Sequence, residues 1–547
     1  MNKIKIGMAQ LNPVLGDFSY NYSKIIKMID NAFKQGVDLL VFPELITTGY
    51  SPRDLLFKSS FIEGNIQCVK DVAAYIPEGI AVILGFVDST SKGLHSAAAL
   101  IHDKNVQAVR YKTLLPNYDV FDEVRYFKPA ESNDPVSWKS KGGIDLSIGL
   151  EICEDLWDSD YRVKVTDELA LKGVDILVNI SASPFTDSKF EERAKLIQDK
   201  VEKLKIPFIY VNMVGAQDEL VFDGNSIAFD SEGRIVGWGG EFCESLNVFD
   251  IESGLGNPVD IHPMDTDEKI YNALVLGVRD YLRKSQFSKA VIGLSGGIDS
   301  ALVASITADA IGSENVLCVA MPSKYSSKAS IDDARELTGS LNVKFRIIPI
   351  DEIVNSYENS LSEMFESLPE DITEENIQAR VRGDLLMAIS NKFNYIVLST
   401  GNKTELALGY CTLYGDMTGG LAVISDVSKE MVYRLSRLIN RKANKQLIPD
   451  SIIEKTPTAE LKANQVDPFD YSVVSPLVDS IINEGKSQRE LIDMGYEKSL
   501  VKDLLDRIQR AEYKRRQAPP GIKISEKAFG NGRRFPIINH FKENSDV

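Results

Sequence analysis

Cysteine and histidine are scarce in this chain of 547 residues, which contains five cysteines and four histidines. The cysteines show no paired spacing, so the sequence indicates neither a disulfide framework nor a zinc cluster. The dispersed histidines add no pattern of metal ligands. The cysteines are Cys68, Cys153, Cys243, Cys318 and Cys411.

The sequence also lacks long apolar runs and a net positive charge. No run approaches the roughly 20 apolar residues that a membrane-spanning helix needs. The first residues lead directly into an expected strand rather than into a signal peptide. A formal net charge of −17 disfavours nucleic acid or an anionic membrane as the main partner. We therefore expect a cytoplasmic protein that acts on small molecules, with no nucleic acid or membrane partner.

What is present is the composition of a globular protein, with 44% hydrophobic and 26% charged residues. A chain of this length is too long for a single core. Between residues 250 and 267 the periodicity fades, and glycine, proline and acidic residues cluster there, which indicates a domain boundary. We expect one domain over residues 1–255 and a second over residues 265–547.

The N-terminal half alternates strand-like and helix-like segments, which predicts layered α/β structure. Helices are expected at 23–33 and 190–204. Strands are expected at 4–9, 39–42, 81–87, 106–111, 146–152, 176–180, 208–211, 226–229 and 234–238.

The C-terminal half has the pattern of a doubly wound parallel sheet, whose ligands bind beyond the carboxyl ends of the strands. Basic residues, proline and glycine gather at 513–534, which is typical of a solvated tail or of a lid over phosphates. The expected helices include 268–282 and 298–310, and the expected strands are 290–294, 316–320, 345–350 and 395–399.

A glycine-rich turn after the expected strand 290–294 is the most informative feature. Ser295, Gly296 and Gly297 allow the backbone to approach an anion closely, and the first amides of the next helix point at it. Ser300 adds a hydroxyl and Asp299 can hold a metal. No Lys-Ser/Thr pair follows the glycines, so this is not a Walker loop. The unit resembles the pyrophosphate loop of the ATP pyrophosphatases, and an ordinary glycine-rich turn is the alternative.

Three residues at expected strand ends fit acyl transfer through a thioester. Glu44, Lys112 and Cys153 each follow or end a strand of the N-terminal half. A thiolate is a good nucleophile, a carboxylate can relay its proton, and an ammonium can stabilise the thiolate and the tetrahedral oxyanion. Taken singly, Cys153 is more often a core thiol, and the other two are more often surface charges.

The surroundings of these three residues resemble the nitrilase, or carbon–nitrogen hydrolase, superfamily over about residues 3–250. The resemblance rests on residues 42–45, 111–116, 117–127 and 151–157. It implies an αββα sandwich in which Glu44 is the general base, Lys112 stabilises the oxyanion and Cys153 is the nucleophile. The residues implied for the glutamine site are Tyr118, Glu123, Ser183 and Lys189.

The C-terminal half resembles the NAD synthetases over about residues 265–540, on the segments 293–300, 375–382, 399–405, 409–416, 457–461 and 512–521. An amidase half fused to such a half is the arrangement of the glutamine-dependent NAD synthetases. The resemblance implies an ATP site of Gly293, Leu294, Ser295, Gly296, Gly297, Ile298, Asp299, Ser300 and Thr400. It implies a deamido-NAD site of Asn376, Glu405, Tyr410, Cys411, Thr412, Leu413 and Lys514.

Asp299 and Glu405 are the best candidates for holding Mg²⁺, which takes one or two protein carboxylates alongside substrate phosphates. Either acid could instead be a helix cap or a surface residue. Arg380 and Arg382 are two residues apart on an expected helix and do not share a face, so at most one points at the nucleotide. Asp467 has no assigned role, because Pro468 follows it where many relatives carry a second acid.

The expected reaction uses glutamine hydrolysis as the source of ammonia and ATP to adenylate deamido-NAD, so that ATP is a co-substrate and NAD a product rather than a cofactor. The family also implies a homo-oligomer. Three alternatives stay open: a glutamine-dependent ligase for another carboxylate or carbonyl, as in GMP synthetase, a nucleotide-binding regulator with an inactive amidase half, and a synthetase that uses only free ammonia. Residues 376–382 and 514–521 argue against the first. The intact set of Glu44, Lys112 and Cys153 argues against the other two.

Overall fold

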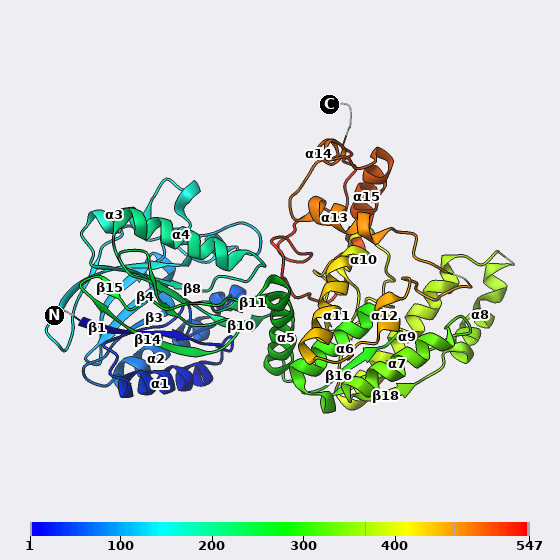
Figure 1. Cartoon of the computed structure of the whole chain (residues 1–547), viewed down its shortest axis with the longest axis horizontal. Coiled ribbons are helices and arrows are strands. Elements are labelled where there is room, and N and C mark those ends of the chain that lie inside the picture. The colour runs from blue at the N-terminus through cyan, green and yellow to red at the C-terminus, as the bar shows by residue number, and fades with distance from the viewer. Residues whose placement is uncertain (1–2, 367, 464, 544–547) are drawn as a thin grey trace. The chain divides into compact units, whose positions relative to one another are not determined.

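The computed structural model describes residues 3–366, 368–463 and 465–543. The chain divides into two compact units between Asp265 and Thr266 (Figure 1). The last strands of the first unit, β14 (Ser245–Glu252) and β15 (Leu255–Gly256), lie partly within the segment where the sequence periodicity fades. Within the described ranges, no helix has the length and apolar composition needed to cross a membrane.

The first unit contains two large sheets. The seven-stranded sheet has the order β15-β14-β1-β2-β3-β4-β5, and the six-stranded sheet has the order β13-β12-β9-β8-β7-β6. The remaining strands of the larger sheet are β1 (Lys3–Gln10), β2 (Leu39–Val41), β3 (Ala81–Thr90), β4 (Gly93–His102) and β5 (Asn105–Tyr111). Those of the smaller sheet are β6 (Val136–Lys139), β7 (Asp145–Ile152), β8 (Ile176–Ser181), β9 (Phe208–Asn212), β12 (Ile227–Phe229) and β13 (Ile235–Trp238). A separate hairpin pairs β10 (Val214–Gln217) with β11 (Leu220–Asp223).

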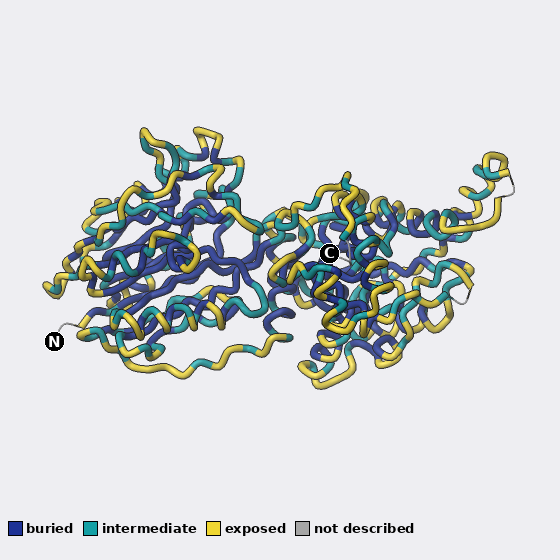
Figure 2. Tube along the Cα trace, turned by 90° about the horizontal axis from the view of Figure 1, so that it is seen from above, coloured by how far each residue is buried: buried dark blue, intermediate teal, exposed yellow. Residues whose placement is uncertain are grey.

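The two sheets pack face to face, because alternate apolar side chains of each strand point between them. Met8 and Ile83 of the larger sheet share one core with Leu150 and Val178 of the smaller sheet. Helices α1 (Phe18–Lys34) and α2 (Ser59–Tyr75) pack on the outer face of the larger sheet. Helices α3 (Val165–Leu171) and α4 (Lys189–Leu204) pack on the outer face of the smaller one. The predicted αββα sandwich is confirmed, and Figure 2 shows burial following its strands.

The second unit contains a five-stranded parallel sheet of order β18-β17-β16-β19-β20. From β16 the chain runs through α6 to β17 and through α7 to β18, and then returns through α8 and α9 to β19 on the other side of β16. Right-handed crossovers place these two sets of helices on opposite faces, so the predicted doubly wound sheet is confirmed. The strands are β16 (Ala290–Gly293), β17 (Val316–Ala320), β18 (Lys344–Ile347), β19 (Ile396–Ser399) and β20 (Leu421–Ala422). The helices are α5 (Thr266–Lys284), α6 (Ile298–Ile311), α7 (Lys328–Leu341), α8 (Asp351–Phe365), α9 (Ile372–Phe393), α10 (Lys403–Leu408), α11 (Lys429–Ala443) and α12 (Asp450–Glu454).

Short helices near the C-terminus pack together against α10 (Figure 1). They are α13 (Tyr471–Ile482), α14 (Gln488–Asp493), α15 (Lys498–Arg510) and α16 (Glu512–Arg515). The basic segment that begins in α16 is docked: Arg515 donates to the carbonyl oxygens of Leu406 and Ala407, and the Ser525 hydroxyl donates to Asp426. Of the two alternatives for this segment, the solvated tail is therefore wrong, and the lid over phosphates stays a prediction.

One strand was misjudged from its apolar pattern. The expected strand 345–350 is β18, which ends at Ile347. Ile348 and Ile350 lie beyond the strand, and Pro349 between them cannot donate a hydrogen bond to a sheet. Ile350 is fully buried ahead of α8, and its backbone N–H donates to the Pro322 carbonyl oxygen at 3.0 Å, so the apolar pattern continues past the end of the strand.

Candidate active sites

The acid and the cation expected in the first unit form a buried ion pair. Glu44 follows β2 and Lys112 follows β5. Lys112 Nζ donates to Glu44 Oε1 at 3.0 Å and to Glu123 Oε1 at 2.9 Å. The Ser96 hydroxyl donates to Glu44 Oε1 at 3.1 Å, and the backbone N–H of Ala182 donates to Oε2 at 3.2 Å. Each oxygen of Glu44 therefore has a donor, and the carboxylate is held in one orientation.

Burial and neighbouring charges have opposite effects on the pKa values of Lys112 and Glu123. Burial lowers the pKa of Lys112, but the carboxylates of Glu123 and Glu44 outweigh it and raise that pKa well above its ordinary value. Burial raises the pKa of Glu123 to about 7, although Lys112 lowers it. The Tyr50 hydroxyl donates to Glu123 at 2.8 Å. Lys112 is thus held as an ammonium beside two carboxyl groups.

Cys153 stands at a sharp turn directly after β7, where it begins the short 3₁₀ helix Cys153–Leu156. Its φ of 46° lies in the left-handed region, which is uncommon for a residue with a side chain. Burial and then the charge of Glu44 raise the pKa of the Cys153 thiol above its usual range. The side chain is therefore a thiol at neutral pH, and it needs a base before it can attack.

Two of the residues expected to bind glutamine approach the turn that Cys153 begins. Tyr118, which is half exposed, donates to both carboxylate oxygens of Glu154 at 3.1 Å. Lys189, the first residue of α4, has its ammonium 3.8 Å from the ring centroid of Trp157. Glu154 lies within the turn and Trp157 caps it, so both side chains lie close to the sequence neighbours of the thiol.

Ser183, another residue expected at the glutamine site, directly follows the residue that contacts Glu44. Ser183 is buried, and its backbone N–H donates to Asn212 Oδ1 at 2.9 Å. The preceding residue, Ala182, supplies the N–H that binds Glu44. The structure thus brings Glu44, Lys112, Glu123 and Ser183 together by direct or adjacent contacts.

In the second unit, the glycine-rich turn joins β16 to α6 as expected. The φ of Gly296 is 79°, and a Cβ atom there would lie 2.3 Å from the backbone oxygen of Ser330, so only glycine fits. The Ser295 hydroxyl accepts from the N–H of Gly297 at 3.1 Å, and the Ser300 hydroxyl donates to the Gly297 carbonyl at 3.0 Å. These hydroxyls stabilise the turn, while no side chain caps the N-terminus of α6.

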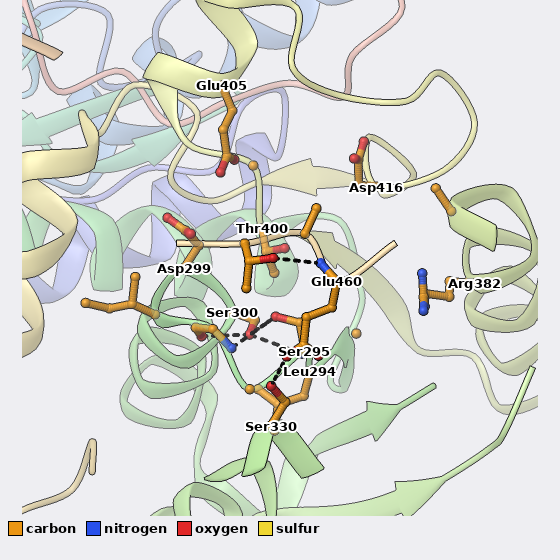
Figure 3. Close-up of a pocket in the computed structure, with 18 of the residues that line it drawn as sticks. Leu294, Ser295, Asp299, Ser300, Ser330, Arg382, Thr400, Glu405, Asp416 and Glu460 are labelled. Atoms are coloured by element: carbon orange, nitrogen blue, oxygen red, sulfur yellow. Dashed lines mark hydrogen bonds between the residues drawn. The ribbon is translucent and has the colours of Figure 1, made fainter. Parts of the chain in front are cut away.

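A cavity of about 300 Å³ opens beside this turn, at the carboxyl ends of β16, β17 and β19. The chain reverses its direction across the sheet between β16 and β19, which is where doubly wound folds bind ligands. Figure 3 shows side chains from the turn, from α9 and from the loop after β19 around this space. All nine residues expected to bind ATP line it: Gly293, Leu294, Ser295, Gly296, Gly297, Ile298, Asp299, Ser300 and Thr400.

Two carboxylates and one lysine share a wall of the cavity. Lys429, the first residue of α11, forms an ion pair with Asp299, and its Nζ lies 3.8 Å from Glu405 Oε1. Burial and then the charge of Asp299 raise the pKa of Glu405 to about 8, although Lys429 lowers it. In the described ranges no three His, Cys, Asp or Glu side chains form a metal-binding group. Asp299 and Glu405 form a carboxylate pair, which suits a cation that takes its other ligands from a substrate.

The residues expected to bind deamido-NAD divide into two groups. Glu405, Tyr410 and Cys411 line the cavity. The others lie around the adjoining loop 409–416: the Thr412 hydroxyl donates to Asn376 at 2.8 Å, and Lys514 Nζ donates to the carbonyl oxygen of Cys411 at 2.6 Å. Leu413 is tied to this loop through its carbonyl oxygen, which accepts from Arg380. Asn376, Thr412, Leu413 and Lys514 do not line the cavity itself.

Arg382 is one of six charged residues that line the cavity and have no role assigned from the sequence. Arg382 lines the cavity and donates to the Met321 carbonyl oxygen at 3.0 Å, whereas Arg380 does not line it. Helix spacing predicts that at most one of these arginines points at the nucleotide. The other five are Asp416, Lys429, Lys455, Glu460 and Asp467.

Lys455 and Asp467 are each held in place by polar contacts. Lys455 Nζ donates to the Gly296 carbonyl oxygen at 3.1 Å and pairs with Asp333. Asp467 accepts from Tyr410 at 3.2 Å and from Tyr471 at 3.0 Å. The motif at 457–461, just after Lys455, is the one sequence signal close to them. Glu460 of that motif lines the cavity and accepts from the Ser330 hydroxyl.

Comparison with known proteins assigns both units. Residues 5–258 match the carbon-nitrogen hydrolase family, and residues 270–518 match the NAD synthase family. The chain is 43% identical to the glutamine-dependent NAD(+) synthetase of Synechocystis sp., over 98% of this chain and 99% of that protein. It is 42% identical to the enzyme of that name from Thermotoga maritima, over 99% of this chain and 100% of that protein.

A solved structure gives the same result. The glutamine-dependent NAD+ synthetase from Acinetobacter baumannii, in complex with adenosine diphosphate, superposes with a TM-score of 0.79 at 37% identity. The match covers 99% of this chain and 100% of that chain. Both halves and the full length therefore agree, and this chain belongs to the glutamine-dependent NAD(+) synthetase family.

Proposed function

We propose that this chain makes NAD from deamido-NAD, with ammonia released from glutamine in the first unit and ATP consumed in the second. The observation that carries the proposal is the presence, in one chain, of a buried acid–lysine–cysteine centre and a cavity at a phosphate-type loop. The co-substrates are glutamine and ATP, and the products are NAD, glutamate, AMP and pyrophosphate.

In the first unit, Cys153 is the nucleophile and Glu44 the base. Because the raised pKa keeps Cys153 as a thiol, Glu44 takes its proton as the sulfur attacks the side-chain amide carbon of glutamine. The carbon–sulfur bond forms and the carbon–nitrogen bond breaks. The proton passes to the leaving nitrogen, which departs as ammonia. Water then hydrolyses the glutamyl thioester to give glutamate and the free thiol.

Lys112 stabilises the negative charge that develops on the carbonyl oxygen. Its ammonium is already held by Glu44 and Glu123 at 3.0 and 2.9 Å, so it does not reorganise during the reaction. Tyr118, Ser183 and Lys189 bind the glutamine around the turn of Cys153, and Glu123 supports Lys112.

In the second unit, residues 293–300 and Thr400 hold ATP, with the phosphates against the N-terminus of α6. The nicotinate carboxylate of deamido-NAD attacks the α-phosphorus. A bond forms between a carboxylate oxygen and the α-phosphorus. The bond from the α-phosphorus to the oxygen that bridges to the β-phosphate breaks, and pyrophosphate leaves. Ammonia then adds to the activated carbonyl and displaces AMP. The product is the amide of NAD. Asn376, Glu405, Tyr410, Cys411, Thr412, Leu413 and Lys514 are the residues proposed to hold deamido-NAD.

Asp299 and Glu405 would hold Mg²⁺. Both carboxylates face one cavity, and burial and then the charge of Asp299 raise the pKa of Glu405, so a bound cation would stabilise their charged forms. When bound, the ion supplies positive charge to the phosphates. Lys429 adds a second positive charge on the same wall.

The test is NAD formation from deamido-NAD, ATP and Mg²⁺ with either glutamine or ammonium as nitrogen donor. We expect NAD with both donors. NAD with neither donor would contradict the proposal and would favour a ligase that acts on another carboxylate. The homo-oligomer stays a prediction, which sedimentation of the purified protein tests. The cytoplasmic location also stays a prediction, which cell fractionation tests.

A further inference from the structure

Asp155 is a buried carboxylate beside the amidase centre that the chemistry above does not use. It lies two residues after Cys153 in the 3₁₀ helix and is 1% exposed. Its Oδ1 accepts from the backbone N–H of Thr113 at 2.9 Å and from that of Leu114 at 2.8 Å. Its Oδ2 accepts from the backbone N–H of Ile152 at 3.0 Å. A single carboxylate thus collects three backbone donors.

These donors come from both sheets of the sandwich. Thr113 and Leu114 follow Lys112 directly, at the end of β5 in the seven-stranded sheet. Ile152 precedes Cys153 directly, at the end of β7 in the six-stranded sheet. Asp155 therefore links the segment that carries Lys112 to the segment that carries Cys153.

The link acts beside a residue with an unfavourable backbone conformation. Cys153 has a φ of 46°, and a residue with a side chain keeps such a conformation only when its surroundings enforce it. The bond from Ile152 to Asp155 restrains the turn just before Cys153, and Asn179 donates to the Cys153 carbonyl oxygen at 3.4 Å. Without Asp155, the turn and the Lys112 segment lose a common support.

We propose that Asp155 is a positioning residue of the amidase, which sets the Cys153 thiol and the Lys112 ammonium on opposite sides of the same substrate carbonyl. The proposal rests on the amidase reaction proposed above. Asp155 does not touch the substrate, so its loss changes the rate of the reaction far more than the binding of glutamine. Displacement of a reacting group by about 1 Å costs about 10²-fold in rate.

The test compares Asp155→Asn and Asp155→Ala with Asp175→Asn. Asparagine keeps one oxygen for Thr113 and Leu114 but turns an N–H₂ donor toward the N–H of Ile152, and alanine removes all three bonds. Asp175 is the matched control, because its Oδ2 accepts from the backbone N–H of Ser147 at 2.8 Å near the other end of β7. For each full-length variant we would measure glutamate release, the rate of Cys153 alkylation by iodoacetamide, and ammonium-driven NAD synthesis.

We expect kcat for glutamate release to fall about 10²-fold in Asp155→Asn, with KM for glutamine nearly unchanged and a changed rate of Cys153 alkylation. Ammonium-driven synthesis, which uses the second unit, stays at the wild-type rate, and Asp175→Asn behaves as wild type. Wild-type kcat in Asp155→Ala would overturn the proposal. So would a parallel loss of ammonium-driven synthesis in both Asp155 variants, which would indicate a general folding role. A wild-type enzyme that releases no glutamate would instead contradict the proposed function itself.

Discussion

The ammonium of Lys112 donates to Glu44 Oε1 at 3.0 Å, and neither side chain is exposed to solvent. Removing one partner of a buried pair leaves the other charge uncompensated, which typically costs about 3–5 kcal/mol. Loss of either partner is therefore expected to destabilise the first unit, and the pair also places the proposed base beside the proposed oxyanion cation. Variants of this pair need a readout that separates folding from chemistry, and the second unit provides one.

Glu44→Gln tests the base. Glutamine keeps the size of the side chain and an oxygen acceptor for Lys112, but it cannot take a proton from Cys153. We expect glutamate release from glutamine to fall by about 10²–10⁴-fold, the usual contribution of a general base. Ammonium-driven NAD synthesis stays at the wild-type rate. Glutamate release at the wild-type rate would show that another group accepts the proton.

Gly85→Ala tests how the fold places Glu44. A Cβ atom at Gly85 would lie 2.3 Å from the backbone oxygen of Pro43 and 2.7 Å from the Cα atom of Glu44, so the backbone that carries Glu44 must move. We expect glutamate release to fall while ammonium-driven synthesis persists. Gly142→Ala is the control, because its added Cβ would come no closer than 3.7 Å to the Ser140 hydroxyl. Equal activity of the two variants would contradict this account of Gly85.

Arg382→Leu tests the cation in the cavity. Burial lowers the pKa of Arg382 to about 10, although Glu460 raises it, and no carboxylate of the described residues lies within 4.0 Å of its guanidinium. Its charge is therefore available to a ligand. A hydrogen bond to a charged group contributes about 1.5–3 kcal/mol, so we expect KM for ATP to rise about 10-fold or more. Arg380→Leu leaves KM for ATP unchanged. An equal rise in both variants would argue against a contact specific to Arg382.

Glu123 gives the first unit a pH-dependent stability. Burial raises its pKa from an ordinary 4.5 to about 7, so between these values the folded protein holds a proton that the unfolded chain has released. The free energy of unfolding contributed by Glu123 therefore falls as pH rises from about 4.5 to about 7. We expect the melting temperature of the wild type, relative to Glu123→Gln, to fall over this range. A relative rise would contradict the direction of the shift.

Much of the fold and both centres could be predicted from the sequence, because the informative signals are local. A buried strand followed by a catalytic residue type placed Glu44, Lys112 and Cys153 at strand ends, and glycines between a strand and a helix identified the phosphate-type loop. The family and the fold class predicted from these motifs are confirmed by relatives that match over the full chain. The reaction is the one proposed above. The residue roles stay predictions.

The parts that were missed depend on contacts between distant segments. Lys429 is 130 residues from Asp299, with which it pairs, and no motif surrounds it. In the sequence, Asp155 is an ordinary acidic residue of a short turn. Its role depends on the backbone N–H groups of Thr113 and Leu114, which donate to it only in the folded structure. The docked position of the basic C-terminal segment could not be predicted, because its partners, such as Leu406, lie about a hundred residues earlier in the chain.

The most direct test of the two-site account is NAD formation by the wild type and by Cys153→Ala, each with glutamine and with ammonium as nitrogen donor. The account predicts that the variant loses glutamine-driven synthesis and keeps ammonium-driven synthesis at the wild-type rate. Glutamine-driven synthesis that persists in Cys153→Ala would contradict the assignment of the nucleophile and, with it, the proposed source of ammonia.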